Sequence, residues 1–293
     1  MDALTDIMRV LQLQVSIFHN AVVCGDWTIR MASREATSFH LVTLGECRMR
    51  VKGFDERILQ AGDLVIFPQD LAHTLEPLAP LSGPQQHLPY GGIADEDGTG
   101  LLCGEALFQH RAGYQLMSAL PPVFVIPRNV NCQWLEPLVT LMIVECQQGD
   151  AGASVLIDRL SELLLLYALR YFLVSQSQPR GVLALYSHPR LAPAVNALHA
   201  DPQRAWTLEH LAQHAAQSRT RFASTFREVS GMTPMAYLTW WRMQLAYQAL
   251  EQGEPVSNVA VKVGYQSESS FIRAFRRMFN LNPGQVRKGV SIL

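Results

Sequence analysis

The feature that most constrains the fold of this 293-residue chain is an internal repeat in its final third. In each copy a short apolar stretch with helical periodicity precedes a tight turn. A second such stretch then begins at a serine, whose hydroxyl can cap free backbone N–H groups. This is the pattern of a helix-turn-helix unit, and it occurs twice. Five positions match at an offset of 49 residues: Ser218 with Ser267, Phe222 with Phe271, Phe226 with Phe275, Arg227 with Arg276, and Pro234 with Pro283.

The second helix of each copy has one apolar face and one polar face. At 3.6 residues per turn, the phenylalanines share a narrow face that is expected to point toward a core. The opposite face carries Thr, Ser and Arg, which hydrogen-bond to bases and phosphates when a helix enters a major groove. These outward positions are Thr220, Ser224 and Arg227 in the first copy, and Ser269, Arg273 and Arg276 in the second.

The distribution of charge separates the chain into two parts. From Pro189 to the end there are 12 basic and 6 acidic residues, a net charge of +6. The first 188 residues hold 12 basic and 19 acidic residues, a net charge of −7. A basic part of this kind favours a polyanionic partner. Together with the repeat, the charge predicts that residues 189–293 bind double-stranded DNA.

The N-terminal part alternates short strand-like runs with turn residues. Many short strands at this spacing are typical of a barrel or a sandwich. Residues 76–100, rich in Pro, Gly, Gln and Asp, are expected to form a long exposed loop. Two helices are predicted over residues 134–147 and 154–174. The second helix is apolar on nearly all sides, so either burial within the domain or a second subunit would cover it. The predicted strands are residues 27–31, 40–44, 47–51, 57–59, 64–67 and 101–108.

The expected architecture is therefore multidomain α+β. Residues 1–178 form the β-rich domain with its helices, residues 179–188 form a linker, and residues 189–293 form the all-α DNA-binding domain. No run of about 18 apolar residues indicates a membrane span. Five scattered cysteines do not form a disulfide framework, and the acidic N-terminus is unlike a secretory signal. These observations predict a cytoplasmic protein with no membrane partner.

The sequence of residues 264–287, GYQSESSFIRAFRRMFNLNPGQVR, resembles the C-terminal signature of AraC/XylS-type transcription regulators. The resemblance covers residues 189–293 and implies two helix-turn-helix units joined by a long helix over residues 234–250. Asn280 stands where the family usually has glycine, and asparagine tolerates the same left-handed helix end. Ala223 and Ile272 cannot donate hydrogen bonds and would at most touch thymine methyls, so part of the specificity is expected to come from DNA shape. By position, the resemblance implies that the base-facing residues are Thr220, Ala223, Ser224, Glu268, Ser269, Ser270, Ile272 and Arg273. Arg219 and Arg221, at the start of the same helix, are further candidates for DNA binding.

The N-terminal part resembles the cupin barrels that are fused to AraC-type regulators. Two motifs carry the resemblance, HLVTLGECRMRV at residues 40–51 and AGDLVIFPQDLAHTL at residues 61–75. It implies a sensor and dimerisation domain. In catalytic cupins these motifs hold a metal ion with three histidines and a glutamate, and here His40, Glu46 and His73 occupy three of those places. Such a set suits a divalent metal, whereas the alternative is a barrel that has lost its metal and binds no cofactor.

Two cysteines are candidates for sensing oxidants. The subgroup that this chain resembles includes sensors of reactive chlorine, which implies a redox role for Cys24 or Cys103. A reactive thiol needs exposure and a lowered pKa, and the alternative is that both thiols are buried and inert. The other cysteines, Cys47, Cys132 and Cys146, lie on apolar stretches and are expected in the core. A small organic effector among Trp27, Phe39 and Phe67 is the other candidate signal.

The sequence thus predicts a sequence-specific transcription regulator whose barrel responds to an effector or an oxidant. Its expected partners are double-stranded DNA, a second copy of the chain and RNA polymerase. An alternative is a cupin metalloenzyme, of the oxygenase or isomerase type, fused to a DNA-binding module. A third possibility is a regulator whose barrel serves only to dimerise.

Overall fold

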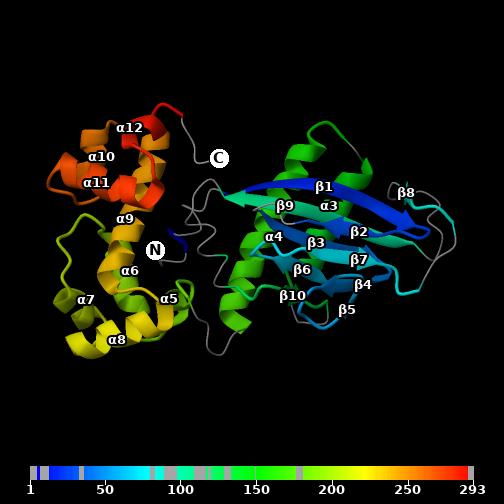
Figure 1. Ribbon diagram of the computed structural model, residues 1–293, viewed down its shortest axis with the longest axis horizontal. Coiled ribbons are helices and arrows are strands. Elements are labelled where there is room, and N and C mark those ends of the chain that lie inside the picture. Colours follow the sequence, from blue (N-terminus) through cyan, green and yellow to red (C-terminus); the bar gives the residue numbers. More distant parts are fainter. Residues whose placement is uncertain are drawn as a thin grey trace. The chain divides into compact units, whose positions relative to one another are not determined.

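The computed structural model of the chain consists of two compact units, one rich in strands and one entirely helical (Figure 1). The first unit comprises Leu13–Leu107 and Leu120–Tyr171, and the second is built on Phe172–Leu293. None of the described helices is long and apolar enough to cross a membrane. The structure describes residues 5–6, 13–32, 36–79, 83–88, 98–108, 117, 120–128, 133–148, 150–175 and 181–289.

The strands of the first unit form two sheets. The larger sheet has six strands in the order β10-β6-β3-β9-β1-β8, and the smaller has four in the order β2-β7-β4-β5. Every strand pairing recorded between described residues is antiparallel. The strands are β1 Leu13–Cys24, β2 Ile29–Met31, β3 Thr37–Leu44, β4 Glu46–Val51, β5 Arg57–Gln60, β6 Leu64–Phe67, β7 His73–Glu76, β8 Gln86–Leu88, β9 Thr99–Phe108 and β10 Phe124–Ile126.

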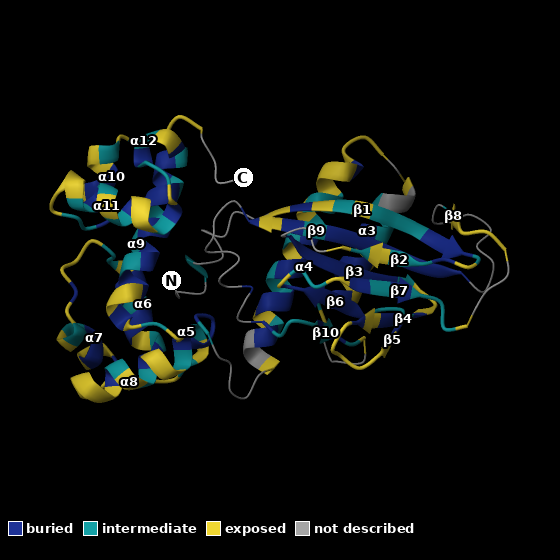
Figure 2. Cartoon of the chain, viewed as in Figure 1, coloured by how far each residue is buried: buried dark blue, intermediate teal, exposed yellow. Residues whose placement is uncertain are grey.

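Burial along the strands shows where the core lies (Figure 2). In β4 buried residues alternate with exposed or half-buried ones, as expected for a strand with one face toward the core. The central strand β3 is instead buried at six successive positions, so both of its faces are covered. Trp27, Val42, Phe67 and Cys103 are among the fully buried side chains of the cluster that fills the unit.

Two helices complete the strand-rich unit, α3 Leu135–Gln148 and α4 Ala153–Ser175. Aromatic contacts fix the position of α4. Tyr171 stacks on Phe124 of β10 with ring centroids 6.4 Å apart, and Tyr167 stacks on Trp134 at 5.0 Å. These contacts place α4 against both the sheet and the start of α3.

The second unit contains eight described helices, and the longest, α9, lies at its centre (Figure 1). Eleven residues of α9 are buried, because helices on both sides pack against it. Both tryptophans of α9, Trp240 and Trp241, are buried, so they pack in the core as their helical spacing suggests. The helices are α5 Ala184–Ser187, α6 Ala192–Ala200, α7 Leu208–His214, α8 Arg219–Ser230, α9 Pro234–Glu251, α10 Val256–Lys262, α11 Glu268–Phe279 and α12 Pro283–Val286.

The helices and strands predicted from the sequence agree with the structure where the residues that determine them are close together in the chain. The six predicted strands and the three longer predicted helices are present, with ends that shift by a few residues. Strands β1, β7, β8 and β10 were not predicted, and β8 lies within the predicted loop 76–100 and pairs with β1. The end of the predicted linker is also structured, because Leu183 and Leu185 are buried around the short helix α5. Residues 80–82 and 89–97 of the predicted loop and residues 179–180 of the predicted linker lie outside the described residues.

Candidate functional site

The two helices predicted to contact DNA, α8 and α11, both begin at the expected serine. The Ser218 hydroxyl accepts a hydrogen bond from the backbone N–H of Arg221 at 3.4 Å. The Ser267 hydroxyl accepts from the backbone N–H of Ser270 at 3.3 Å. Each serine has extended backbone angles, as the first residue outside a helix requires. The two copies of the repeat therefore start their second helices by the same local mechanism.

The phenylalanines hold both helices against α9. Phe222 and Phe226 of α8 are at most 1% exposed, and the Phe226 ring contacts Tyr237 of α9 edge to face. On α11, the Phe275 ring stacks on Tyr247 of α9 with centroids 6.0 Å apart. Burying such rings removes a large apolar area from water and fixes the rotation of each helix about its axis. The polar faces of α8 and α11 are consequently turned outward.

The residues predicted to contact DNA lie on these outward faces. The side chains available for hydrogen bonds to bases or phosphates include Thr220 and Ser224 on α8 and Ser269 and Arg273 on α11, all exposed. Ala223 and Ile272 are half-buried at the edge of the same faces. The structure thus brings the predicted residues together in two groups, one on each helix. The remaining exposed members are Arg219, Arg221 and Glu268, and Ser270 is half-buried.

Local hydrogen bonds change the role expected for two of these residues. The Ser270 hydroxyl donates to the Ser267 backbone carbonyl at 3.0 Å and contacts the Ser267 hydroxyl at 2.5 Å. The Ser224 hydroxyl donates to the Arg221 carbonyl at 3.0 Å. Such bonds to the helix backbone compete with bonds to a base. Arg273 is exposed and forms no ion pair with a described residue, so its guanidinium is available for further hydrogen bonds.

The turn that precedes each of these helices has the same geometry in both copies. Gly264 has a φ of +82°, and at the equivalent place in the first copy Ala216 has a φ of +49°. Each turn is closed by an equivalent pair of backbone hydrogen bonds, including Gln217 N–H to Ala212 and Tyr265 N–H to Ala260. The positive φ at Ala216 was not predicted, because alanine rarely adopts it. Alignment of the two copies at an offset of 48 places Ala216 opposite Gly264 and is the signal that could have found it.

The helix ends agree with the expectation for asparagine. Helix α8 ends at Gly231 with a φ of 75°, and α11 ends at Asn280 with a φ of 57°, both in the left-handed region. In each case the backbone N–H of the capping residue bonds to a carbonyl four residues earlier. Asn280 therefore closes its helix in the same way as the glycine of the first copy.

The barrel contains a buried pair of histidines. Nε2 of His40, on β3, lies 2.6 Å from Nε2 of His73, on β7, and Nδ1 of His73 lies 2.6 Å from the Leu71 carbonyl oxygen. Because the carbonyl can only accept, Nδ1 of His73 carries a proton, and Nε2 of His40 must then donate to His73. Burial lowers the pKa of His40 well below its ordinary value, and the neighbouring His73 and His19 lower it further. Burial also lowers the pKa of His73, and lowered pKa values favour the neutral form of both rings.

Two of the three predicted metal ligands, His40 and His73, come together, and the third, Glu46, does not. Glu46 is exposed, because Cys47 points into the barrel and successive side chains of β4 point to opposite faces. The two histidine nitrogens are closer than the spacing of about 3.3 Å expected for neighbouring ligands around a tetrahedral ion. No group of three or more His, Cys, Asp or Glu that could hold a metal occurs among the described residues. The arrangement fits a hydrogen-bonded histidine pair rather than a divalent metal.

The cysteines predicted to sense oxidants are buried. Cys103 is fully buried on β9, and burial raises the pKa of its thiol far above the ordinary value. Cys24, at the end of β1, is 8% exposed. Cys47 is in the core as expected, and burial raises the pKa of its thiol to about 12. Cys132 and the side chain of Cys146 lie outside the described residues.

The aromatic residues predicted to surround an effector do not all lie on one face of the larger sheet. Trp27, Phe39 and Phe67 are all fully buried. Phe39 and Phe67 also point to opposite faces of the larger sheet, because Phe67 is paired with Ser38 and side chains alternate along β3. A Cβ added at Gly104 would lie 2.5 Å from the ring of Phe39, so that ring packs directly on the neighbouring strand.

The fold and the two outward helices define a class of protein, the DNA-binding transcription regulators with a separate β-rich domain. Residues 2–173 match the family described as Cupin, and residues 211–289 match the family described as Helix-turn-helix domain. The chain is 32% identical over 298 residues to the RCS-specific HTH-type transcriptional activator RclR of Escherichia coli, covering 100% of this chain and 99% of that protein. It is 31% identical over 306 residues to an AraC-like transcription regulator of Streptomyces lividans, covering 98% of each chain.

These similarities, which extend over the whole chain, show the family. The chain belongs to the AraC family of transcription regulators, with an N-terminal cupin domain and a C-terminal helix-turn-helix domain. Among solved structures, it is similar to an AraC-type regulator from Chromobacterium violaceum, with 25% identity and a TM-score of 0.33. That alignment covers 35% of this chain and 92% of the other.

Proposed function

We propose that this protein is a regulator whose cupin domain receives a signal and whose helical domain binds a specific DNA sequence. The observation that carries the proposal is the matched orientation of α8 and α11. Both helices bury their phenylalanines against α9 and expose their polar faces. Two such helices on one domain can enter successive major grooves.

We expect some of these residues to contact DNA bases and others to contact DNA phosphates. Arg273 is proposed to bond to guanine, and Thr220 and Ser269 to bases or phosphates. Ala223 and Ile272 offer only apolar contact, so sequence-dependent DNA shape contributes at those positions. Arg219 and Arg221 lie at the start of α8, where positive side chains are placed to neutralise phosphates.

We propose that the regulator acts as a homodimer in the cytoplasm. Four large apolar side chains are exposed on α3 and α4, and an interface with a second copy would remove them from water. Two linked copies would occupy two DNA sites with increased avidity. The name of the Escherichia coli relative, an activator, supports RNA polymerase as a further partner. The exposed side chains are Leu141, Val155, Leu156 and Leu163.

The signal proposed first is a small ligand that biases the population of two states of the regulator. Oxidant sensing through Cys24 or Cys103 is the second candidate, because the Escherichia coli relative is named RCS-specific. The burial of both thiols favours the small ligand, since a thiol needs exposure and a low pKa to react. A cupin metalloenzyme is disfavoured, because Glu46 points away from the histidine pair.

A footprint on the DNA upstream of the protein's own gene tests this proposal, with genome-wide site selection if that region is not protected. The purified chain is compared with Arg273→Ala and with the control Arg57→Ala, an exposed arginine on β5. Arg273→Ala is expected to weaken binding to the selected site by about 1–3 kcal/mol and to leave binding to random DNA nearly unchanged. Equal loss in both variants, or no selected site at all, would refute sequence-specific recognition by α11. Repeating the footprint with mild hypochlorous acid tests the second signal.

A further inference from the structure

A cavity of about 540 Å³ lies at one end of the smaller sheet. It is formed where β2 and β4 end and β7 begins, at Met31, Val51 and His73. These three residues are neighbours across the sheet, since both Met31 and Val51 are paired with His73. The volume is within the range of sites for small organic molecules.

The next row of the sheet places hydrogen-bond donors beside one another along the wall of this cavity. Thr74 of β7 is paired with Arg30 of β2 on one side and with Arg50 of β4 on the other. Side chains directly opposite each other on neighbouring strands point to the same face and lie close together. A guanidinium, a hydroxyl and a second guanidinium therefore form a continuous row, and all three residues line the cavity.

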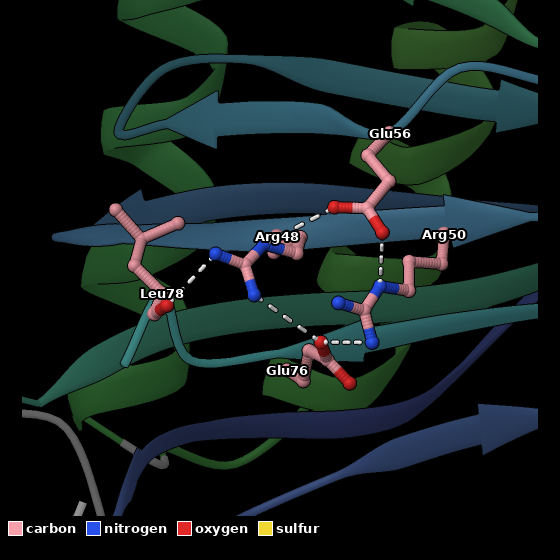
Figure 3. A network of polar contacts seen from close by, with 5 residues as sticks. All are labelled: Arg48, Arg50, Glu56, Glu76 and Leu78. Atoms are coloured by element: carbon pink, nitrogen blue, oxygen red, sulfur yellow. Dashed lines mark hydrogen bonds and ion pairs between the residues drawn. The ribbon is translucent and has the colours of Figure 1, made fainter. Parts of the chain in front are cut away.

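One carboxylate, that of Glu56, lines the cavity and another, that of Glu76, lies nearby, and both are paired with arginines, as Figure 3 shows. Glu56 contacts Arg50 at 2.7 Å and Arg48 at 3.6 Å, and Glu76 contacts the same two arginines at 2.8 and 3.7 Å. Arg48 also donates to the Leu78 carbonyl at 2.9 Å. This cluster of two arginines and two glutamates is balanced in charge. These ion pairs hold Arg50 in place at the cavity, and both carboxylates of the cluster are used in them.

Two positively charged side chains that line the cavity do not belong to this charge-balanced cluster. Arg30 and Lys52 line the cavity and are exposed, and no carboxylate in the described part of the chain pairs with either of them. The cavity therefore carries an excess of positive charge. Positive charge gathered in a concave site attracts an anion more strongly than the same charge on a flat surface.

The rest of the lining is apolar or already hydrogen-bonded. Phe54, which is 47% exposed, Met31 and Val51 offer apolar surface. His73 is committed through both ring nitrogens, to His40 and to the Leu71 carbonyl. A ligand that fits this lining needs an acidic group for the arginine row and an apolar body for Phe54.

We propose that this cavity binds a small organic carboxylate, whose acidic group contacts Arg30, Thr74 and Lys52 and whose apolar body packs on Phe54. This inference rests on the proposed function, because it gives the cupin domain a place and a chemical class for its signal. A phosphate group of DNA is the alternative source of negative charge. The concave shape and the apolar lining favour the carboxylate.

Isothermal titration of the full chain with 4-phenylbutyrate tests the proposal, with 4-phenylbutyramide as a neutral analogue of the same shape. The acid is expected to bind with saturation at least about tenfold more tightly than the amide, since a paired charge in a cavity is worth about one decade of affinity. The variants Arg30→Gln and Lys52→Gln are each expected to lose about fivefold or more in affinity for the acid. The control Arg57→Gln removes an exposed arginine outside the cavity and is expected to change nothing.

Several results would overturn the assignment. They are the absence of saturable binding, equal affinity for acid and amide, or an equal loss in Arg57→Gln. Competition by inorganic phosphate at the same concentration as 4-phenylbutyrate would also overturn it and would favour a phosphate site. DNA footprints of Arg30→Gln and Lys52→Gln without ligand are expected to match the unmodified chain. If titration fails while those footprints are intact, the carboxylate site is wrong and the proposed DNA-binding function stands.

Discussion

Gly264 and Gln203 approach so closely that a Cβ added to Gly264 would lie 2.6 Å from the Gln203 carbonyl oxygen. The same Cβ would lie 2.7 Å from a guanidinium nitrogen of Arg242. That guanidinium is itself fixed, because it donates to the carbonyls of Pro202 at 2.7 Å and Arg204 at 2.8 Å. The turn of the second helix-turn-helix unit thus rests on the segment between α6 and α7, and Arg242 of α9 ties the two together.

Gly264→Ala is expected to destabilise the helical domain by about 2–4 kcal/mol. The substitution adds the cost of a positive φ to a clash with backbone that has no room to move. Urea unfolding of the full chain, followed by circular dichroism at 222 nm, measures the change at the helical transition. Gly231→Ala is the matched control, because Gly231 also has a positive φ but has nothing within 4 Å of the added Cβ. The free energy of unfolding of Gly231→Ala should fall by only about 1 kcal/mol. Equal losses would show that the contact with Gln203 is not tight.

The DNA-contacting helices could be predicted from the sequence because their determinants are local. Ser267 starts α11, Phe271 and Phe275 set its buried face, and Asn280 ends it, all within one stretch of chain. Helix α8, in the first helix-turn-helix unit, has a starting serine, two buried phenylalanines and a left-handed end at the corresponding positions. The two copies of the repeat therefore support the same prediction independently. Their shared packing on α9 could be inferred only from the family resemblance, since it depends on contacts between distant residues.

The chemistry of the barrel could not be predicted in the same way, because it depends on strand register. A shift of one residue turns a side chain to the opposite face of a sheet. The motif correctly brings His40 and His73 together, but the alternation of β4 directs Glu46 outward. The row of Arg30, Thr74 and Arg50 comes from three strands whose pairing the sequence does not reveal.

Ser267→Ala is expected to lower the stability of the helical domain by about 1 kcal/mol, the usual cost of losing a serine N-cap. The hydroxyl of Ser267 accepts from the Ser270 N–H and also contacts the Ser270 hydroxyl, so both partners lose a bond. Ser267→Asp keeps an acceptor at the helix start and should retain most of the stability. The same urea transition measures both variants. If Ser267→Ala has no effect, or if Ser267→Asp is the less stable variant, the cap is not what fixes the start of α11.

Cys103 is expected to resist alkylation in the folded protein, because burial removes access and raises the pKa of its thiol, which lowers the thiolate fraction at neutral pH. Iodoacetamide labelling at pH 7.5, followed by mass spectrometry of peptides, compares native and urea-unfolded protein. Cys24, which is 8% exposed, should react faster than the fully buried Cys103 and Cys47. Rapid native labelling of Cys103 would contradict its burial and would favour an oxidant over a small ligand as the signal.

The buried environment of His199 predicts that the helical domain loses stability in acid. Its Nε2 lies 2.7 Å from the Tyr237 hydroxyl, which in turn lies 2.9 Å from the Tyr186 hydroxyl. Its ring stacks on Trp241 with centroids 3.8 Å apart. Burial lowers the pKa of His199 to about 3, although the Asp6 carboxylate lies 3.7 Å from Nδ1. The ring is therefore neutral in the folded domain.

The pH dependence of unfolding follows from that lowered pKa. Below about pH 6.5 the unfolded chain binds a proton at His199 that the folded chain does not, so the unfolded state gains stability as the pH falls. The contribution of His199 is present above pH 6.5 and is lost progressively toward pH 3, by up to about 1.4 kcal/mol per pH unit. His199→Gln removes this titration and should flatten the dependence of unfolding free energy on pH between 6 and 4 by about that amount. Parallel curves for the unmodified chain and His199→Gln would show that His199 is not held neutral in the fold.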